Sequence, residues 1–278
     1  MRAFRVIPLA VLLVFLAAAR AVPGQPPAPP TPAQLQAYEA FRAWVTTQSD
    51  LRQASDEVVF KRYAEELVRR GQTDAQAAST IATVRSLGDR AEIERWNRIL
   101  TAENPQFNTA PNAFLVEMTK GLKPGRSLDV GMGQGRNTIY LAKQGWDSVG
   151  FDPAERAVEA AQAQARKLGL HITTTVARDT EYEWGEAQWD LIVLSYVGGR
   201  EYVTSVQRAG RSGGMVVLEG FHRDATKSGP IGGSVVFDTN ELLQLFSGFR
   251  IIRYEDEDAV ADFGRGTTRV VRLAAIKP

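Results

Sequence analysis

Residues 127–137 read SLDVGMGQGRN, a short apolar segment that runs directly into three alternating glycines and then into a helical pattern. Glycines at 131, 133 and 135 let the main chain turn sharply and approach a ligand closely, and a helix that begins there offers free N–H groups. The spacing is G-x-G-x-G, and Arg136 stands where a dinucleotide-binding fingerprint requires glycine. By itself such a turn indicates either a ligand site or simply a tight connection.

The chain after residue 125 alternates between apolar segments and helical patterns, which is typical of right-handed βαβ units and a mostly parallel sheet. We therefore expect a doubly wound α/β fold. Helices are predicted at 136–144 and 155–168, and two final strands at 250–254 and 267–274 form an antiparallel pair joined by the acidic loop 255–262. The five predicted strands before that pair are 127–130, 148–151, 172–176, 191–194 and 215–218.

Three aspartates lie at or near the ends of the first three predicted strands. Asp152 closes the second strand, 17 residues beyond Gly135, where a carboxylate can accept two ribose hydroxyls. Asp179 follows the third strand and can accept from an exocyclic amine, and Asp129 can hold an amino group directly or through water. Each acid alone is more typical of a helix cap or a loop than of a ligand site. Together they favour a ligand site, because ligands of open α/β sheets bind at the carboxyl ends of the strands.

The glycine turn and its flanking acids resemble the S-adenosylmethionine site of class I methyltransferases. The resemblance extends from about residue 96 to residue 278, and the Gly-Arg-Asn after the turn is similar to the tellurite-resistance and thiopurine-type branch. The family implies a Rossmann-like, seven-stranded sheet with a terminal antiparallel hairpin. The segments that carry the resemblance are 111–115, 124–137, 140–142, Gly145, 150–152, 189–193, 213–218, 241–246 and 272–278.

The same resemblance implies S-adenosylmethionine as the cofactor and assigns a role to several residues. Asp152 would hold the ribose, and Asp179 and Thr180 the adenine. We add Ser195, after the fourth strand, to the cofactor-binding residues. The residues that would line the methionine part are Asp129, Gly131, Gly133 and Gly135.

Methyl transfer is an in-line displacement, so holding the two reactants in line is the main requirement. The candidates for chemistry follow the fourth and fifth strands. Tyr196 can pack against a sulfonium by cation–π contact or serve as a wall of the site, and His222 can act as a base or simply lie at the surface. Ser195 and Glu219 are the other two candidates. Cysteine is absent, and no Asn-Pro-Pro-Tyr motif follows the fourth strand, which disfavours DNA-base acceptors. We expect a small-molecule acceptor and no metal site, and residues 229–234 form either a mobile lid over the acceptor or simply a long loop.

The first 21 residues carry basic residues, a long apolar run and an Ala-Arg-Ala sequence, which together predict an export signal cleaved near Val22. An exported protein would be periplasmic or secreted; if the segment is not cleaved, it anchors the chain to a membrane. Six prolines make 22–32 an extended linker. We divide the rest into a helical region, 33–100, and a methyltransferase domain, 101–278.

Charge argues against nucleic acid as a partner. The predicted signal holds three of the 33 basic residues and none of the 32 acidic ones, so the remainder is slightly negative. No membrane span is expected once the signal is removed.

Helical periodicity predicts four helices between residues 33 and 100. A capping box, in which Thr73 and Gln76 bond each other's main chain, should open the third. Gly88 should end it, and a fourth helix should carry Ile93, Trp96 and Leu100.

Two other functions fit parts of the pattern. A non-catalytic binder of S-adenosyl compounds or nucleosides needs the same turn and acids. A nicotinamide-dependent oxidoreductase needs the dinucleotide fingerprint, which Arg136 interrupts.

Overall fold

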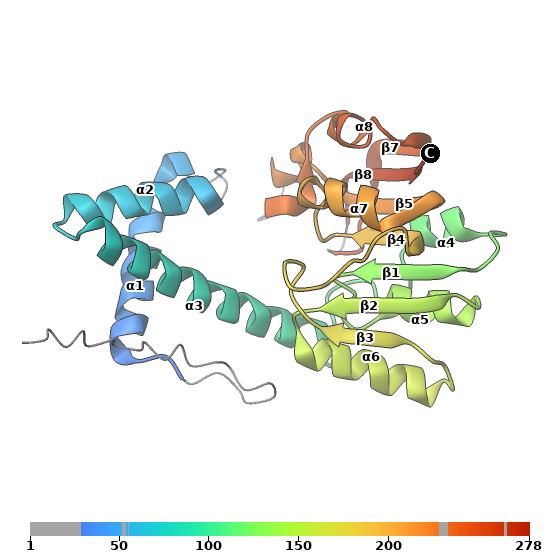
Figure 1. Ribbon diagram of the computed structural model, residues 1–278, viewed down its shortest axis with the longest axis horizontal. Helices are drawn as coiled ribbons and strands as arrows, with labels where there is room; N and C mark the ends of the chain where they lie inside the picture. The colour runs from blue at the N-terminus through green and yellow to red at the C-terminus, as the bar shows by residue number, and fades with distance from the viewer. Residues whose placement is uncertain (1–28, 52–53, 55, 228–232, 264–265) are drawn as a thin grey trace, which may run out of the picture.

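The computed structural model describes residues 29–51, 54, 56–227, 233–263 and 266–278 (Figure 1). The predicted export signal, most of the linker and most of the predicted 229–234 lid lie outside these residues. Within the described ranges, no helix combines the length and the apolar character needed to cross a membrane.

One mixed sheet forms the centre of the described structure, with strand order β3-β2-β1-β4-β5-β8-β7 and the short β6 paired to β5. The first five strands are parallel to one another, and β8 runs antiparallel to both β5 and β7. The predicted α/β fold with a terminal antiparallel hairpin is therefore confirmed, with β6 as an eighth strand among the described residues. The strands are β1 (Arg126–Val130), β2 (Asp147–Asp152), β3 (Thr173–Val176), β4 (Trp189–Ser195), β5 (Gly210–His222), β6 (Val236–Phe237), β7 (Arg250–Val260) and β8 (Thr267–Ile276).

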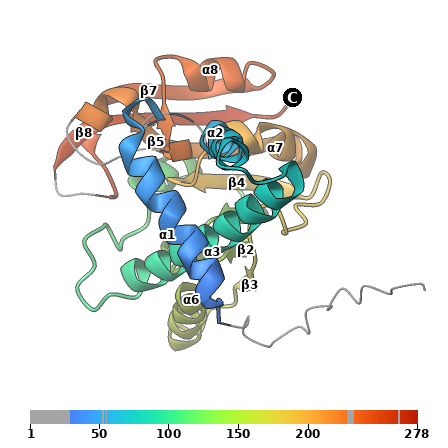
Figure 2. The same cartoon turned by 90° about the vertical axis from the view of Figure 1, so that its left-hand side faces the viewer.

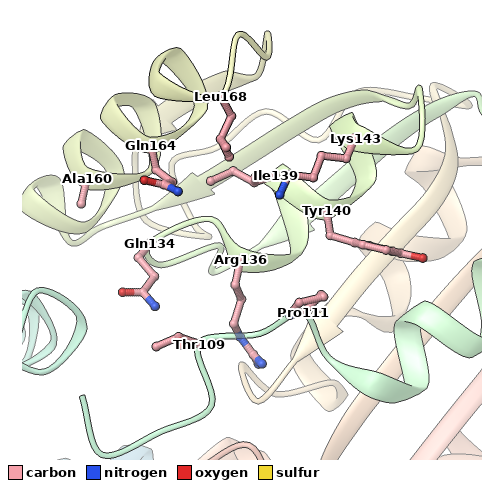
Figure 3. A pocket seen from close by; sticks show the side chains of 10 residues that line it. All are labelled: Thr109, Pro111, Gln134, Arg136, Ile139, Tyr140, Lys143, Ala160, Gln164 and Leu168. Carbon is pink, nitrogen blue, oxygen red and sulfur yellow. The ribbon is translucent and has the colours of Figure 1, made fainter. Parts of the chain in front are cut away.

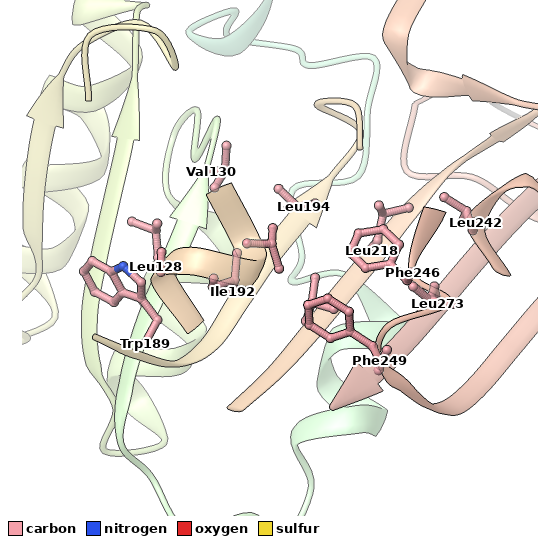
Figure 4. Close-up of a cluster of buried hydrophobic side chains, with 14 of the residues drawn as sticks. Leu128, Val130, Trp189, Ile192, Leu194, Leu218, Leu242, Phe246, Phe249 and Leu273 are labelled. Atoms are coloured by element: carbon pink, nitrogen blue, oxygen red, sulfur yellow. The ribbon is translucent and has the colours of Figure 1, made fainter. Parts of the chain in front are cut away.

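Helices cover both faces of the sheet, so the apolar side chains on each face are buried. On one face, Phe114 of α4 and Leu141 of α5 pack on Val193 of β4. On the other face, Val206 of α7 and Phe246 just after α8 join the largest cluster of buried side chains (Figure 4). The helices of this part are α4 (Ala113–Thr119), α5 (Arg136–Lys143), α6 (Glu155–Lys167), α7 (Val203–Ala209) and α8 (Glu241–Leu245), with 3-10 turns η2 (Arg200–Tyr202), η3 (Arg223–Lys227) and η4 (Gly233–Val235).

The N-terminal helices α1 (Pro32–Thr47), α2 (Asp56–Arg69) and α3 (Asp74–Leu100) stand to one side of the sheet, with the 3-10 turn η1 (Ser49–Leu51) between the first two (Figures 1 and 2). They have their own core, in which Trp44, Tyr63 and Leu67 are buried. The C-terminal end of α3 reaches the carboxyl edge of the sheet beside α6 (Figure 1). The Thr73–Gln76 capping box is present, with both of its hydrogen bonds.

The prediction that Gly88 ends a helix is wrong, because α3 is continuous from Asp74 to Leu100. A glycine in a helix interior costs only about 1 kcal/mol relative to alanine, which tertiary packing offsets. A Cβ at Gly88 would lie 3.8 Å from the Tyr38 ring, so α1 passes close to α3 at this point. The predicted third and fourth helices are therefore one.

The predicted acidic loop 255–262 is also wrong for most of its length, because β7 continues to Val260. Its acids pair with arginines of β8. Arg269 bonds Asp256 at 2.7 Å, and Arg272 bonds Glu255 at 2.9 Å. Cross-strand pairs of opposite charge stabilise a sheet. The acidic residues that the sequence suggested as a solvated loop therefore form one strand of the β7–β8 hairpin.

Candidate functional site

The three glycines of the turn after β1 all have left-handed main-chain conformations, with φ of 62° at Gly131, 54° at Gly133 and 77° at Gly135. Side chains other than glycine are disfavoured there. The turn is also crowded: a Cβ at Gly131 would lie 2.3 Å from Val197 Cγ1, and one at Gly135 would lie 2.7 Å from Ala161 Cβ. The glycines therefore serve both the turn and the close approach of its neighbours.

Asp129 lies within β1 rather than at its end, and its side chain is 2% exposed. Its Oδ2 accepts from the Thr138 hydroxyl at 2.6 Å and from the Thr138 N–H at 3.1 Å. Burial raises the pKa of this carboxyl to about 6, although the hydrogen bonds from Thr138 oppose that shift. Asp129 thus holds the first turn of α5 against the sheet and carries a charge that costs free energy at neutral pH.

Asp152 is the last residue of β2, and its carboxylate faces the glycine turn. Oδ2 accepts from the Gly133 N–H at 2.9 Å, and Oδ1 accepts from the Ala154 N–H at 2.7 Å. Burial raises the pKa of Asp152, against the effect of these two bonds. Because a carboxylate oxygen can accept about two hydrogen bonds, both oxygens keep capacity for a pair of hydroxyl donors.

Asp179 and Thr180 lie in the loop after β3, at the same edge of the sheet. The Tyr202 hydroxyl donates to Asp179 at 3.1 Å, and burial, followed by the charge of Asp179, raises the pKa of Tyr202. Thr180 is exposed. In the same loop, Tyr182 stacks on Phe151 of β2 at 4.1 Å between ring centroids.

Ser195 is the last residue of β4 and Tyr196 follows it, directly beside the turn. Arg136 donates to Ser195 at 3.3 Å. Tyr196 has φ of 60°, which for an aromatic residue is a strained conformation that costs on the order of 1–3 kcal/mol. Its hydroxyl donates to Glu219 at 2.5 Å, and burial, then the Glu219 charge, raises its pKa. A phenol bound to a carboxylate in this way is not a base, so the ring is the part of Tyr196 left for contact.

The structure does not bring His222 to this cluster. His222 ends β5, and alternation along the strand places its side chain on the face opposite to that of Glu219. Its Nδ1 accepts from the Asp224 N–H at 3.1 Å, which leaves Nε2 to donate to the Thr239 hydroxyl at 2.9 Å. Both ring nitrogens are therefore occupied away from Tyr196.

A buried ion pair that the sequence reasoning missed closes the site from the β7–β8 side. Arg136 bonds Asp262 at 2.6 Å, and Asn112 donates to the same carboxylate at 2.7 Å. Burial alone would raise the pKa of Asp262, but the hydrogen bond and charge of Arg136 hold it below its ordinary value. No sequence signal joins Arg136 to a residue so far along the chain.

The end of α3 packs against the glycine turn. Leu100 side-chain carbons lie 3.3 Å from the position of a Cβ on Gly133. Asn97 accepts from the Arg156 N–H at 2.9 Å, which caps α6, whose own N-cap residue, Ala154, forms no side-chain cap. Helix α3 is thereby joined to the turn itself and to the start of α6.

A pocket of about 490 Å³ lies nearby, on the outer side of α5 (Figure 3). Gln134 and Arg136 belong to both the pocket and the turn region, whereas Lys143 and Gln164 come from the outer surfaces of α5 and α6. The space directly beside Gly131 and Gly133 is instead taken up by the ends of Val197 and Leu100. The pocket's remaining lining residues are Thr109, Pro111, Ile139, Tyr140, Ala160 and Leu168.

A family model described as tellurite resistance protein TehB matches residues 104–269, more than half of the chain. The chain belongs to this family. Among curated relatives, the probable S-adenosyl-L-methionine-dependent methyltransferase TehB of Haemophilus influenzae (strain 10810) is 27% identical over 155 residues, which are 53% of this chain and 54% of the relative. This TehB family member thus spans about half the length of the curated relatives it matches.

Solved structures agree on the fold. The crystal structure of TehB from Haemophilus influenzae has a TM-score of 0.51 and 21% identity, covering 60% of this chain and 62% of that one. A methyltransferase from Methanosarcina mazei, described as S-adenosylmethionine-dependent, has a TM-score of 0.50 and 18% identity, covering 58% and 96%. At these identities the likeness concerns the fold alone, and it supports the Rossmann-like prediction.

Proposed function

We propose that this chain binds S-adenosylmethionine and transfers its methyl group to a small-molecule acceptor by in-line displacement. The observation that carries the proposal is the buried Asp152 carboxylate, bound to the Gly133 N–H at the end of β2 in a chain of the TehB family. This carboxylate and the left-handed glycines form one unit at the edge where open α/β sheets bind ligands.

The residues present fit an adenosyl ligand in their chemistry. Asp152 keeps acceptor capacity for the two ribose hydroxyls, and Asp179 and Thr180 offer oxygens on the adenine side. Asp129 and the glycine turn would line the methionine part of the donor. Ser195 would lie near the junction of the methionine and adenosyl parts. Entry requires the flexible end of Leu100 to turn away from Gly133. When bound, S-adenosylmethionine supplies a methyl group on a sulfonium centre.

In this proposal the chain positions the two reactants and supplies no group that takes a proton from the acceptor. The Tyr196 hydroxyl donates to Glu219, and His222 is bound on the opposite face of the sheet. Neither is placed to take a proton from an acceptor beside Ser195. We therefore propose that the acceptor arrives as a ready nucleophile, and that its alignment by the chain accounts for the rate.

Calorimetry with S-adenosylmethionine, S-adenosylhomocysteine and NAD tests the cofactor. Asp152→Ala should weaken binding of the first two by about 1–3 kcal/mol, because hydroxyl partners are then left unpaired. Asp147→Ala, at the opposite and exposed end of β2, is the matched control and should bind normally. Unchanged affinity in Asp152→Ala, or preferential binding of NAD, would refute the proposal.

Turnover separates an enzyme from a non-catalytic binder. Purified protein is incubated with S-adenosylmethionine and a panel of thiols and oxyanions, and the S-adenosylhomocysteine released is measured. Release that depends on one acceptor class supports methyl transfer. Tight donor binding without release from any member of the panel supports the binder.

We further propose that residues 1–21 direct export and that cleavage leaves Val22 at the amino terminus. The support is the basic start, the apolar run and the Ala-Arg-Ala sequence. Amino-terminal sequencing of the protein from fractionated cells tests this. An intact Met1 on protein from the cytoplasmic fraction would refute it.

A further inference from the structure

Tyr196 is fixed more firmly than packing alone requires. Its main-chain N–H donates to the Glu219 carbonyl at 2.8 Å, and its hydroxyl donates to the Glu219 carboxylate at 2.5 Å. The same hydroxyl accepts from the Asp262 N–H at 3.2 Å. The positive φ of Tyr196 is unfavourable for a bulky residue, so it is kept only because surrounding contacts hold it in place. Residues in such strained conformations are often found at functional sites.

Glu219 is suited to hold Tyr196 because its own charge is neutralised within the sheet. It is 3% exposed, and Arg272 of the neighbouring β8 donates to its second oxygen at 2.9 Å. Arg272 in turn bonds Glu255 of β7. Arg272 therefore holds one oxygen of the carboxylate, and the bond from the phenol to the other oxygen sets where the Tyr196 ring lies.

The Tyr196 main chain lies next to the glycine turn. Tyr196 stands between Ser195, which Arg136 bonds, and Val197, which contacts Gly131. Phe221 and Phe263 support the ring at centroid distances of 4.9 and 5.4 Å. The Tyr196 side chain therefore extends from main chain that borders the part of the site that we assign to the methionine portion of the donor.

We infer that Glu219 is a positioning residue that holds the Tyr196 ring against the positive sulfonium of the methyl donor, so that the chain binds S-adenosylmethionine in preference to neutral S-adenosylhomocysteine. This inference rests on the proposed function. A ring face attracts a cation through its quadrupole and has no such attraction for an uncharged thioether. The arrangement favours binding of the donor and release of the demethylated product.

The test is the ratio of the two dissociation constants, measured by calorimetry on each variant. Tyr196→Leu removes the ring and should reduce the preference for S-adenosylmethionine by about 2- to 30-fold, the range for a cation–π contact. Glu219→Ala should shift the ratio in the same direction, and Glu219→Gln, which keeps an acceptor oxygen, should restore it. Glu257→Ala, which also removes a partner of Arg272 but does not touch Tyr196, is the matched control.

A further comparison shows whether Glu219 acts through the hydroxyl. Once Tyr196→Phe has removed that hydroxyl, Glu219→Ala should change the ratio no further. Equal losses of affinity for both ligands in the variants, or an additive double variant, would overturn the inference and leave the proposed function standing. Wild-type protein that binds neither ligand would refute the proposed function and this inference with it.

Discussion

Replacing Asp129 with asparagine should remove a pH dependence from the stability of this protein. The Asp129 carboxyl has a pKa of about 6 in the folded chain because burial disfavours its charge, against 3.8 for an ordinary aspartate. Between these values the folded state binds more protons than the unfolded state. The stability that this group contributes is therefore fully present below about pH 3.8 and is lost as the pH rises through 6.

The size of the effect follows from the two pKa values. One pKa unit corresponds to 1.36 kcal/mol, so the full difference is about 3 kcal/mol, and about 1.4 kcal/mol of it falls between pH 5 and pH 7.5. Asparagine at 129 can still accept from Thr138 but does not ionise. Relative to the Asp129→Asn variant, the wild-type chain should thus lose about 1.4 kcal/mol over that interval.

Urea unfolding at several pH values, followed by circular dichroism, measures this difference. Taking the difference between wild type and variant cancels the groups whose titration does not depend on Asp129, and it also cancels any constant penalty from the buried amide of asparagine. Parallel stability profiles for the two proteins would show that burial does not perturb Asp129 and would refute the argument. Wild-type stability that rises relative to the variant between pH 5 and pH 7.5 would mean that the carboxylate is stabilised in the fold.

Three other substitutions test the packing around the site. Asp262→Ala leaves Arg136 buried without its carboxylate and should lower the unfolding free energy by about 3–5 kcal/mol; a loss below about 1 kcal/mol would mean that water reaches the pair. Gly131→Ala should destabilise the chain more than Gly169→Ala, since both glycines have positive φ but only the first has a neighbour within 4 Å, and equal losses in thermal melts would contradict the close approach. Gly88→Ala should raise the unfolding free energy by about 0.5–1 kcal/mol, because it lies inside a helix with room for a methyl group, and a destabilised variant would show that α1 packs more tightly there.

Local sequence patterns were enough to predict the sheet and the turn. Short apolar strands and alternating helices are encoded by neighbouring residues, and the glycines at 131, 133 and 135 are required by the main chain itself. The tryptophans at 184 and 189 are buried in the core of the sheet.

Features that depend on distant partners could not be predicted. The acids of β7 resemble a loop until the arginines of β8 are placed opposite them. Nothing local distinguishes Gly88 from a helix end, and nothing joins Arg136 to Asp262. His222 was chosen as a candidate base because histidine suits proton transfer. In β5 its side chain lies on the face opposite to Glu219, and the sequence could not show this because an error of one residue in the strand register would exchange the two faces.

Helix α3 begins among α1 and α2 and ends on the glycine turn without a break. At 1.5 Å per residue its 27 residues form a lever about 40 Å long. A surface or another protein bound to α1 and α2 would, by moving α3, displace Leu100 and Asn97, which contact the glycine turn and the start of α6. Attachment at the amino-terminal end would in this way be converted mechanically into a change of ligand access at the far end.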